Sequence, residues 1–598
     1  MKQSPKTILF SILFTLIGYF LSAQPASCYY PAVNYTAGAN PFCVESSDFN
    51  NDGIKDLATS NLISNNVSIL FGTGGGLYSA PTNYTVANDP WKLKSADFNA
   101  DGNIDLAVVC LNKDSVSILL GSPTGIFSNP INYKAGTFPV SLVVVDFNSD
   151  TNMDIAIANQ TSGDVIVLMG VGNGAFLPPV NYLAGSTPNF IISPDLNMDG
   201  FFDLVVTNLN SNDISVFLGS SNGIFSAAVN YSVGLNPRSV TSADFNNDGS
   251  ADIAVGIEGS NEISVLLGSP SGTFAAIVNY PTGSHPFSIT CSDFNNDGIQ
   301  DLVTANYFAP NISVLFGSGT GTFSSPTSYS VGSSPAYVSA SDVNGDGMVD
   351  ILVANSGSAN VSVLLNGIPS ITFSTPNEIC TGNTLTITAS GADTYAWNTG
   401  ANTNTIVVNP LTNTSYTVVA TTTLGCSNTA VKTITVNALP SISIITSNTL
   451  ICSGETATLT ASGVNTYSWS SGSLVSNEIV TPTTSTDYTV TGTDINGCSN
   501  IATITQSVSL CTGIETVTAN NQIEVYPNPV NAVLYIDIEI EKPDTKINIY
   551  NTLGTLVFSD ALISSKNQVN IDELRNGIYI MKIIQNNRII STGKIVRE

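Results

Sequence analysis

Aspartates recur along the chain at a spacing that suits an oxygen-rich metal site. The motif D-x-N-x-D-x-x-x-D occurs seven times, beginning at residues 48, 97, 146, 195, 244, 293 and 342. In such a loop, side-chain oxygens from positions 1, 3 and 5 can turn to one point, a backbone carbonyl at position 7 can join them, and position 9 can close the cage. These ligands predict calcium, because zinc and copper favour sulfur or imidazole and magnesium keeps its waters.

Each loop supplies five predicted calcium ligands. They are Asp48, Asn50, Asp52, Ile54 and Asp56; Asp97, Asn99, Asp101, Asn103 and Asp105; Asp146, Asn148, Asp150, Asn152 and Asp154; Asp195, Asn197, Asp199, Phe201 and Asp203; Asp244, Asn246, Asp248, Ser250 and Asp252; Asp293, Asn295, Asp297, Ile299 and Asp301; and Asp342, Asn344, Asp346, Met348 and Asp350. Three carboxylates so close together repel one another, so bound calcium should stabilise the fold, with affinities of about 10⁻⁴–10⁻³ M.

Position 6 separates the third loop from the others. It is glycine in six loops, which allows the positive φ that the sharp turn requires, but Thr151 in the third. A β-branched residue resists that backbone conformation, so we expect the third site to be strained or empty.

Two other kinds of structure have similar acidic loops. EF-hands need helical flanks and a glutamate at position 12, where Thr59 and Gly256 stand in two copies. Asx-rich turns without metal are the second, although turn chemistry alone does not require aspartate at position 9 in every copy.

The loops belong to a 49-residue repeat that also carries a tyrosine and a proline, first seen as Tyr35 and Pro41. Each unit predicts four short strands, with the acidic loop between the first and second. A unit of this size is typical of a propeller blade, and closing seven blades removes exposed sheet edges. The last unit lacks its fourth strand, so we expect Tyr29–Tyr35 to complete it. An open solenoid, the alternative, would not need this strand.

A second repeat follows the predicted propeller of residues 28–367. Cysteine and tryptophan residues recur 72 positions apart in segments of alternating apolar and polar residues, which predicts two small β-sandwiches, residues 368–438 and 439–510, before a linker at 511–522. One cysteine pair per module suggests the disulfides Cys380–Cys426 and Cys452–Cys498, although sequence alone does not fix connectivity. The tryptophans, Trp397 and Trp469, are expected in the cores.

The other five cysteines have no assigned partner in the sequence. Cys28 and Cys43 could pair near the N-terminal strand of the propeller. The partners of Cys110, Cys291 and Cys511 stay open.

The two ends of the chain differ in composition from the repeats between them. Residues 1–23 predict an export signal, since Lys2 and Lys6 precede an apolar run, Ile8–Leu21, that is too short to span a bilayer. A membrane anchor is the alternative. Residues 523–598 carry 8 of the 17 basic residues and predict a separate small β-domain.

Composition excludes several classes of function. The net charge of −27, with only 10% charged residues, argues against binding nucleic acid or an anionic membrane surface. Hydrophobic residues make up 42% of the chain, which indicates folded cores. The only histidine is His285, so mechanisms that need two are excluded.

The loops, with Ile118–Ser122 and Gly125–Phe127, resemble the FG-GAP/VCBS repeats of bacterial surface proteins and are similar to the calcium-binding blades of integrin α-subunits. The resemblance implies a seven-bladed propeller with calcium in the loop between the first two strands of each blade. The family often has aspartate at position 3, where this chain has asparagine, which implies weaker binding.

The C-terminal segment also resembles a known family. Val525–Val530, Ile549–Asn551, Gly554 and Asn576–Tyr579 are similar to the type A sorting domain of the type IX secretion system of Bacteroidetes. This resemblance implies that residues 523–598 engage the secretion machinery and that the protein is secreted or held on the outer cell surface. The two sandwich modules resemble Ig-like or PKD-like spacers.

Together these observations predict an all-β protein: a seven-bladed β-propeller, two Ig-like β-sandwiches and a small C-terminal β-sandwich. We expect a binding or adhesion protein for a glycan or protein ligand, not an integral membrane protein. Recognition would fall on the polar loops opposite the acidic ones, at 159–164, 208–213, 306–311 and 355–360.

The alternative is a polysaccharide lyase or hydrolase. It is disfavoured because most acidic residues belong to the repeated loops and no G-x-S-x-G, H-E-x-x-H or phosphate-binding motif occurs. His285, in a Ser-His-Pro turn, is expected to be a surface loop residue.

Overall fold

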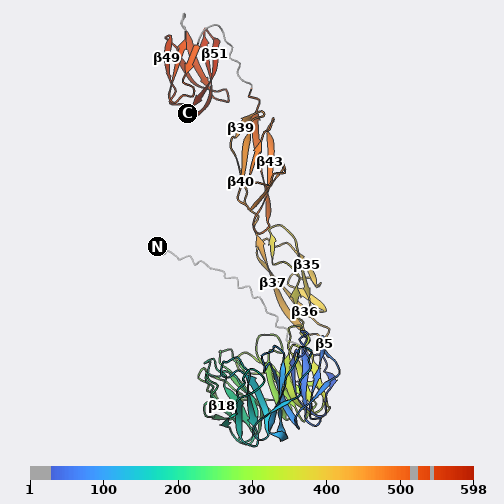
Figure 1. The fold of residues 1–598 in the computed structure, drawn as a ribbon. Helices are drawn as coiled ribbons and strands as arrows, with labels where there is room; N and C mark the ends of the chain where they lie inside the picture. Colours follow the sequence, from blue (N-terminus) through green and yellow to red (C-terminus); the bar gives the residue numbers. More distant parts are fainter. Residues whose placement is uncertain (1–27, 512–522, 539–543) are drawn as a thin grey trace, which may run out of the picture. The chain divides into compact units, whose positions relative to one another are not determined.

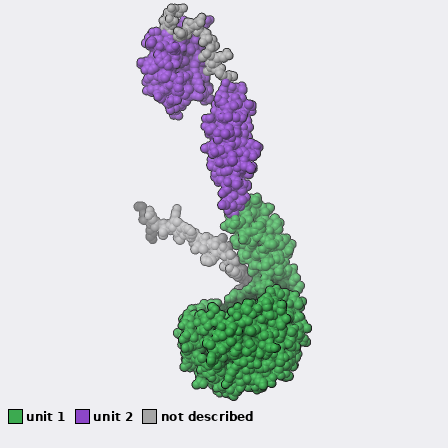
Figure 2. Space-filling view, in the orientation of Figure 1, with its two compact units in different colours: residues 1–436 green, residues 437–598 purple. Residues whose placement is uncertain are grey.

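The computed structural model describes residues 28–511, 523–538 and 544–598, which form strands and a short 3-10 helix, Leu111–Lys113 (Figure 1). The predicted export signal and nearly all of the predicted linker lie outside these residues. Among the residues described, no helix is long and apolar enough to cross a membrane. The chain divides into two compact units, residues 1–436 and 437–598 (Figure 2).

Within its described residues, the first unit contains seven four-stranded antiparallel sheets between residues 33 and 364. Six are built from consecutive strands: β2 (Pro41–Ser47), β3 (Asp56–Asn61), β4 (Asn66–Leu70) and β7 (Thr82–Thr85); β8 (Pro90–Ala96), β9 (Asp105–Cys110), β10 (Ser115–Leu119) and β11 (Ile131–Lys134); β12 (Pro139–Val145), β13 (Asp154–Asn159), β14 (Asp164–Leu168) and β15 (Val180–Leu183); β16 (Pro188–Ile192), β17 (Leu204–Asn208), β18 (Asp213–Phe217) and β19 (Val229–Ser232); β20 (Pro237–Ala243), β21 (Asp252–Ile257), β22 (Glu262–Leu266) and β23 (Val278–Pro281); and β24 (Pro286–Ser292), β25 (Asp301–Asn306), β26 (Asn311–Leu315) and β27 (Thr327–Ser330). A small hairpin, β5 (Gly72–Gly74) and β6 (Leu77–Tyr78), follows β4.

The seventh sheet joins the two ends of the array. It contains β28 (Pro335–Ser341), β29 (Asp350–Asn355) and β30 (Asn360–Leu364), and its fourth strand is β1 (Val33–Thr36), antiparallel to β30 with Val33 opposite Val363. The predicted closing strand is therefore confirmed. The first strands of the seven sheets also contact one another in a cycle, because β2 touches both β8 and β28.

Apolar packing between neighbouring sheets explains why the 49-residue period is kept. The second and third strands of each sheet are almost wholly buried, as in β21. The repeated tyrosine of each fourth strand packs edge-on against an aromatic ring of the next sheet; Tyr84 and Phe127, for example, have ring centroids 5.4 Å apart. Such an aromatic pair contributes about 1 kcal/mol beyond its buried area.

The segment after the array forms two facing sheets. The strands are β31 (Thr372–Phe373), β33 (Leu385–Ser390) and β35 (Thr405–Val408) in one, and β32 (Glu378–Cys380), β37 (Ser427–Asn437), β36 (Thr414–Thr421) and β34 (Thr394–Trp397) in the other. Their core contains Ile387, Val418 and Trp397, so the expected burial of the tryptophan is confirmed.

The second unit begins with the same arrangement. Its strands are β38 (Ser443–Thr446), β40 (Ala457–Ser462) and β42 (Asn477–Val480), and β39 (Leu450–Cys452), β44 (Ser499–Ser509), β43 (Thr486–Thr493) and β41 (Thr466–Trp469). Trp469 is buried in this core, as expected.

The C-terminal segment, residues 523–598, folds around a core of its own. One sheet contains β45 (Ile523–Tyr526), β46 (Val533–Ile538) and β49 (Lys566–Asn570), and the other β48 (Leu556–Ala561), β47 (Thr545–Tyr550), β50 (Gly577–Gln585) and β51 (Arg588–Arg597). Leu534, Ile549 and Ile583 are fully buried between them.

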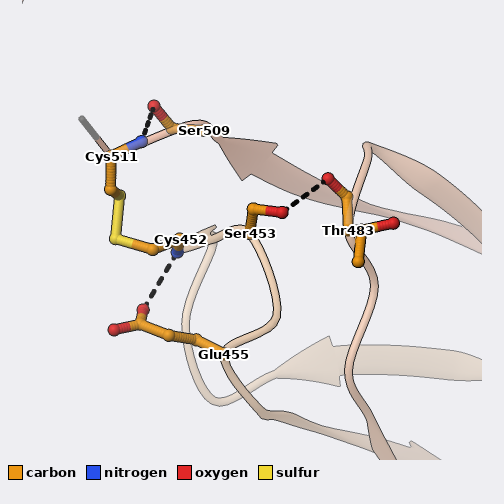
Figure 3. The surroundings of a disulfide bond; sticks show 6 residues. All are labelled: Cys452, Ser453, Glu455, Thr483, Ser509 and Cys511. Carbon is orange, nitrogen blue, oxygen red and sulfur yellow. Dashed lines mark hydrogen bonds between the residues drawn. A yellow bond between two sulfur atoms is a disulfide. The ribbon is translucent and has the colours of Figure 1, made fainter.

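The predicted disulfide pairings are wrong. Cys452 is bonded to Cys511 rather than to Cys498 (Figure 3). The reason is that β39 runs parallel to β44, with Cys452 beside Ser509, so the chain brings Cys511 to it two residues later. Cys426 is not bonded to Cys380 but lies buried against Cys28, with which its side chain forms a hydrogen bond. Cys28 therefore does not pair with Cys43.

Candidate functional site: the seven acidic loops

Each acidic loop connects the first strand of a sheet to the second, so all seven lie at the same end of their sheets. The first two loops are in contact: the Asn51 side-chain amide donates a hydrogen bond of 2.9 Å to Asn103 Oδ1 of the second loop. The loop ends of the sheets also interlock, because Gly321 N donates to the Phe245 carbonyl at 2.9 Å. The fold thus gathers the predicted site residues on one rim.

In each loop, positions 1, 3 and 5 turn their side-chain oxygens towards the loop backbone. In the fifth loop, Asp244 Oδ1 and Asn246 Oδ1 accept hydrogen bonds from the same nitrogen, Asp248 N, at 3.1 and 2.9 Å. Asp248 Oδ1 in turn accepts from Ser250 N at 2.8 Å. The oxygens of positions 1 and 3 are therefore brought side by side, and the backbone holds them there.

The aspartate at position 9 is placed differently. Asp252 is fully buried, and its carboxylate accepts hydrogen bonds from Phe245 N at 2.8 Å and Gly268 N at 2.6 Å. It thereby ties the acidic loop to the start of the connection between the third and fourth strands. The other six loops repeat both bonds, through Asp56, Asp105, Asp154, Asp203, Asp301 and Asp350.

Position 9 therefore has a structural role that needs no metal. One of the two bonds reaches a residue 16 positions away, so aspartate at position 9 has a reason beyond turn chemistry: its carboxylate accepts from two separate backbone donors. Among the residues described, no three His, Cys, Asp or Glu side chains are gathered closely enough to hold a metal ion. Each loop instead presents the carboxylates of positions 1 and 5 with the amide oxygen of position 3.

Burial has an electrostatic cost at position 9. Desolvation raises the pKa of Asp56, Asp105 and Asp154 to about 6, although the two backbone hydrogen bonds to each oppose the rise. Repulsion from the carboxylates at positions 1 and 5 adds to it. The pKa of Asp301 and Asp350 rises to about 7 for the same reasons.

The loops fit a hard cation by their donors and their charge. Their side-chain ligands are all oxygen, and position 7 varies so widely that only its main chain is common to all loops. Among the described residues, the contacts between basic and acidic side chains are Lys94–Glu45, Arg238–Glu258, His285–Glu258 and Lys566–Asp537, so no loop carboxylate is paired with a basic side chain. The loop charge is left for a cation to neutralise.

The third loop keeps the shape of the others at the expense of backbone strain. Thr151 has φ +72°, in the left-handed region, and its N–H donates to Asp146 Oδ2 at 2.7 Å, as the corresponding glycine does elsewhere. The strain expected for a β-branched residue at this position is confirmed.

The predicted recognition loops lie at the opposite end of the sheets, between second and third strands. Their first residues are structural: Asn208 is fully buried and donates to Asp213 Oδ1 and Ser215 Oγ, both at 2.8 Å. Their tips are exposed; Phe308, for example, has 70% of its surface accessible. His285 is half-buried at this end, 3.0 Å from Glu258 Oε1 and tilted against the Phe308 ring at 4.0 Å, so it has more contacts than were expected of a surface loop residue.

A cavity at this same end was not singled out from the sequence. It is lined by the residue that follows the repeated proline in each of the seven sheets, together with Lys92, Phe190 and Tyr337. The sequence does carry a sign of this cavity, because the residue after the repeated proline changes from copy to copy while the proline itself does not.

Two protein-family models match the chain, one over the acidic loops and the other over the C-terminal segment. A model described as an FG-GAP-like repeat matches residues 48–108, 97–157, 195–255 and 293–353, and these four matches include all seven acidic loops. A model described as a secretion system C-terminal sorting domain matches residues 524–598. No curated protein matches the chain.

Several solved structures are similar to the chain at low identity. A chain from a crystal structure of BBS1N in complex with ARL6DN has a TM-score of 0.43 and 15% identity, over 57% of this chain and 97% of that one. A periplasmic gluconolactonase from Pseudomonas aeruginosa has a TM-score of 0.39 and 17% identity, over 53% and 88%. A putative 6-phosphogluconolactonase from Bacteroides uniformis has a TM-score of 0.38 and 14% identity, over 67% and 100%.

The sorting domain marks proteins that the type IX secretion system exports to the cell surface or the extracellular space. The chain thus contains FG-GAP-like repeats, arranged as a propeller-like array of sheets, and a type IX secretion sorting domain at its C-terminus.

Proposed function

We propose that this chain is a calcium-stabilised binding or adhesion protein. Its seven-bladed propeller would bind a glycan or protein ligand outside the cell, and the two sandwich modules would be Ig-like spacers. Calcium would be held by the carboxylates of positions 1 and 5, the amide oxygen of position 3 and the main chain of position 7. Bound there, it would neutralise the rim so that the seven sheets close.

The observation that carries the proposal is the set of acidic loops without basic partners. Seven copies of an oxygen-only loop lie at the same end of their sheets, and none of their carboxylates forms an ion pair with a described basic residue. In this proposal a cation neutralises their charge, and the opposite end of the sheets is available to bind a ligand. Export by the sorting domain carries the protein outside the cell, where calcium-binding modules typically have affinities of about 10⁻⁴–10⁻³ M.

The binding role can be tested with the protein as exported, without residues 1–23. It is applied to glycan and protein arrays in about 2 mM calcium and, in parallel, in a chelator, a range set by the affinities of extracellular sites. We expect ligand binding in calcium that is lost in the chelator. A folded, calcium-loaded protein that binds nothing on either array contradicts the proposal.

A second candidate, a polysaccharide-active enzyme, is favoured by a single contact. The only histidine, His285, lies 3.0 Å from Glu258, and partial burial lowers the pKa of His285, so a neutral imidazole faces a carboxylate. Such a pair can move a proton during glycosidic bond cleavage. Release of reducing ends or unsaturated sugars from extracted polysaccharides, abolished in His285→Ala and in Glu258→Gln, would establish the enzyme and overturn the binding role.

A further inference from the structure

The cavity at the end of the sheets opposite the acidic loops has the chemistry of a ligand site. Its walls come from one repeated position, the residue after the proline that opens each first strand. This position is aromatic in three copies, Phe42, Trp91 and Phe287, and arginine in a fourth, Arg238. A position with a purely structural role in a repeat would keep its residue type, as the proline itself does.

The three aromatic residues at this position contact one another in series along part of the cavity wall. Phe42 stacks on Trp91 with ring centroids 4.0 Å apart and meets Phe287 edge-on at 6.0 Å, across Ala336, whose short side chain leaves the space open. Phe287 stacks in turn on Tyr307 at 4.9 Å. Broad apolar faces of this kind contact the C–H face of a sugar ring.

A buried cation lies at the base of the cavity. Lys92 is 5% exposed, and its Nζ lies 2.9 Å from the centroid of the Phe190 ring and 3.2 Å from Ser141 Oγ. In the part of the chain that the structure describes, Lys92 forms no ion pair; the neighbouring Lys94 takes the nearby carboxylate, Glu45. A buried ammonium group without an anion is unfavourable unless a ligand supplies one.

Arg238 adds a second cation to the wall. Its guanidinium group lies over the Phe287 ring at 3.9 Å, and its Nε is buried without a hydrogen-bond partner. Glu258 Oε2 stands 3.5 Å from that Nε, which gives an ion pair but no hydrogen bond. No acidic residue lines the cavity. Two cations with unused donors thus face a space from which carboxylates are absent.

We propose that this cavity binds an acidic sugar, a uronic acid unit of a polysaccharide. Its carboxylate would enter between Lys92 and Arg238 while its ring rests on Trp91 and Phe42. The cavity is narrow, which suits a carboxylate group rather than a whole ring. This inference rests on the binding role proposed above and names its ligand class.

Burial also lowers the pKa of Lys92 well below its ordinary value. An arriving carboxylate would oppose that shift and hold the proton on Nζ, so ligand binding and protonation of Lys92 would favour each other.

The test is calorimetric titration of the calcium-loaded protein with trisaccharides of galacturonate, glucuronate and mannuronate, and with the methyl ester of each. We expect at least one acid to bind, and its ester to bind at least tenfold more weakly. Lys92→Met and Arg238→Gln should each weaken binding at least tenfold. Lys134→Met, which removes an exposed lysine from the outer strand β11, should leave it unchanged.

Thermal unfolding of each variant shows that the fold is kept, and Arg238→Gln provides the test if Lys92→Met fails to fold. Equal binding of acid and ester overturns the inference, as does binding that survives both substitutions. The inferred uronate site is also overturned if no uronate binds but a neutral glycan does, or a peptide does through its C-terminal carboxylate. Either result still supports the proposed binding role. Absence of any ligand on the arrays overturns the proposed function itself.

Discussion

At the scale of single residues, aspartates of the same loop have different roles. Asp252 is buried and holds two backbone N–H groups, whereas Asp248 lies at the surface and faces the turn. The first serves the fold and the second is available to a cation. The sequence motif does not show this difference, because both positions carry the same residue type at regular spacing.

Substitution at the two positions should separate these roles. In a chelator, Asp252→Asn should lower the free energy of unfolding by about 2 kcal/mol, because an amide offers one acceptor oxygen to two buried N–H donors. Asp248→Asn should change stability little in a chelator but reduce the stabilisation gained from calcium. Denaturant unfolding with and without calcium measures both. Equal losses for the two variants in the chelator would refute a structural role for position 9.

Thr151 offers a residue-scale test of backbone strain. Thr151→Gly should raise the free energy of unfolding by about 1 kcal/mol, because glycine adopts φ +72° without the penalty of a β-branched side chain. The matched reverse change, Gly249→Thr in the fifth loop, should destabilise by a similar amount. Thermal unfolding of the two variants is the measurement, and a destabilised Thr151→Gly would contradict the strain.

We expect the buried Lys92 to lower the free energy of unfolding of the natural chain at pH 7. Its folded pKa lies well below the unfolded value of about 10.4, so the folded chain binds fewer protons and its stability rises as pH rises towards that value. Lys92→Met should therefore be more stable than the natural chain at pH 7, by about 2 kcal/mol, and its advantage should shrink towards pH 10. Chemical unfolding across this pH range provides the comparison, and a less stable Lys92→Met at pH 7 would show that the lysine serves the fold.

At the scale of elements, the 49-residue period predicted the sheets, the loop positions and the closing strand. It succeeded because each unit repeats the same local signals, and because a missing fourth strand at one end matched a spare strand at the other. The disulfides could not be predicted in this way. Cys511 has no counterpart in the 72-residue repeat, and only the parallel pairing of β39 with β44 brings it to Cys452.

The Cys452–Cys511 bond should stabilise the second sandwich by closing a long loop. The bonded cysteines are 59 residues apart, and a cross-link of this span contributes roughly 4 kcal/mol through the unfolded chain. Cys511→Ser and Cys452→Ser should lower its stability alike, whereas Cys291→Ser, within the propeller, should not affect this module. Unfolding of the module under non-reducing conditions measures the change. A module as stable in Cys511→Ser as in the natural chain would show that the bond does not contribute.

At the scale of the whole molecule, charge and closure are linked. The chain carries −27, and the acidic loops concentrate part of that charge on one rim of a closed ring of sheets. The cavity at the other end escaped prediction because its residues are far apart in the sequence and converge only when the ring closes. The ring thus brings together one surface suited to a cation and another suited to a ligand.

The most direct test of this account is thermal unfolding of the exported protein in a chelator and across a calcium series up to about 10 mM, well above the expected site affinities, with bound metal determined by elemental analysis. We predict six or seven calcium ions per chain and an unfolding midpoint that rises with each tenfold increase in calcium, with magnesium much less effective. An identical midpoint in chelator and calcium, with no bound calcium, would contradict the account.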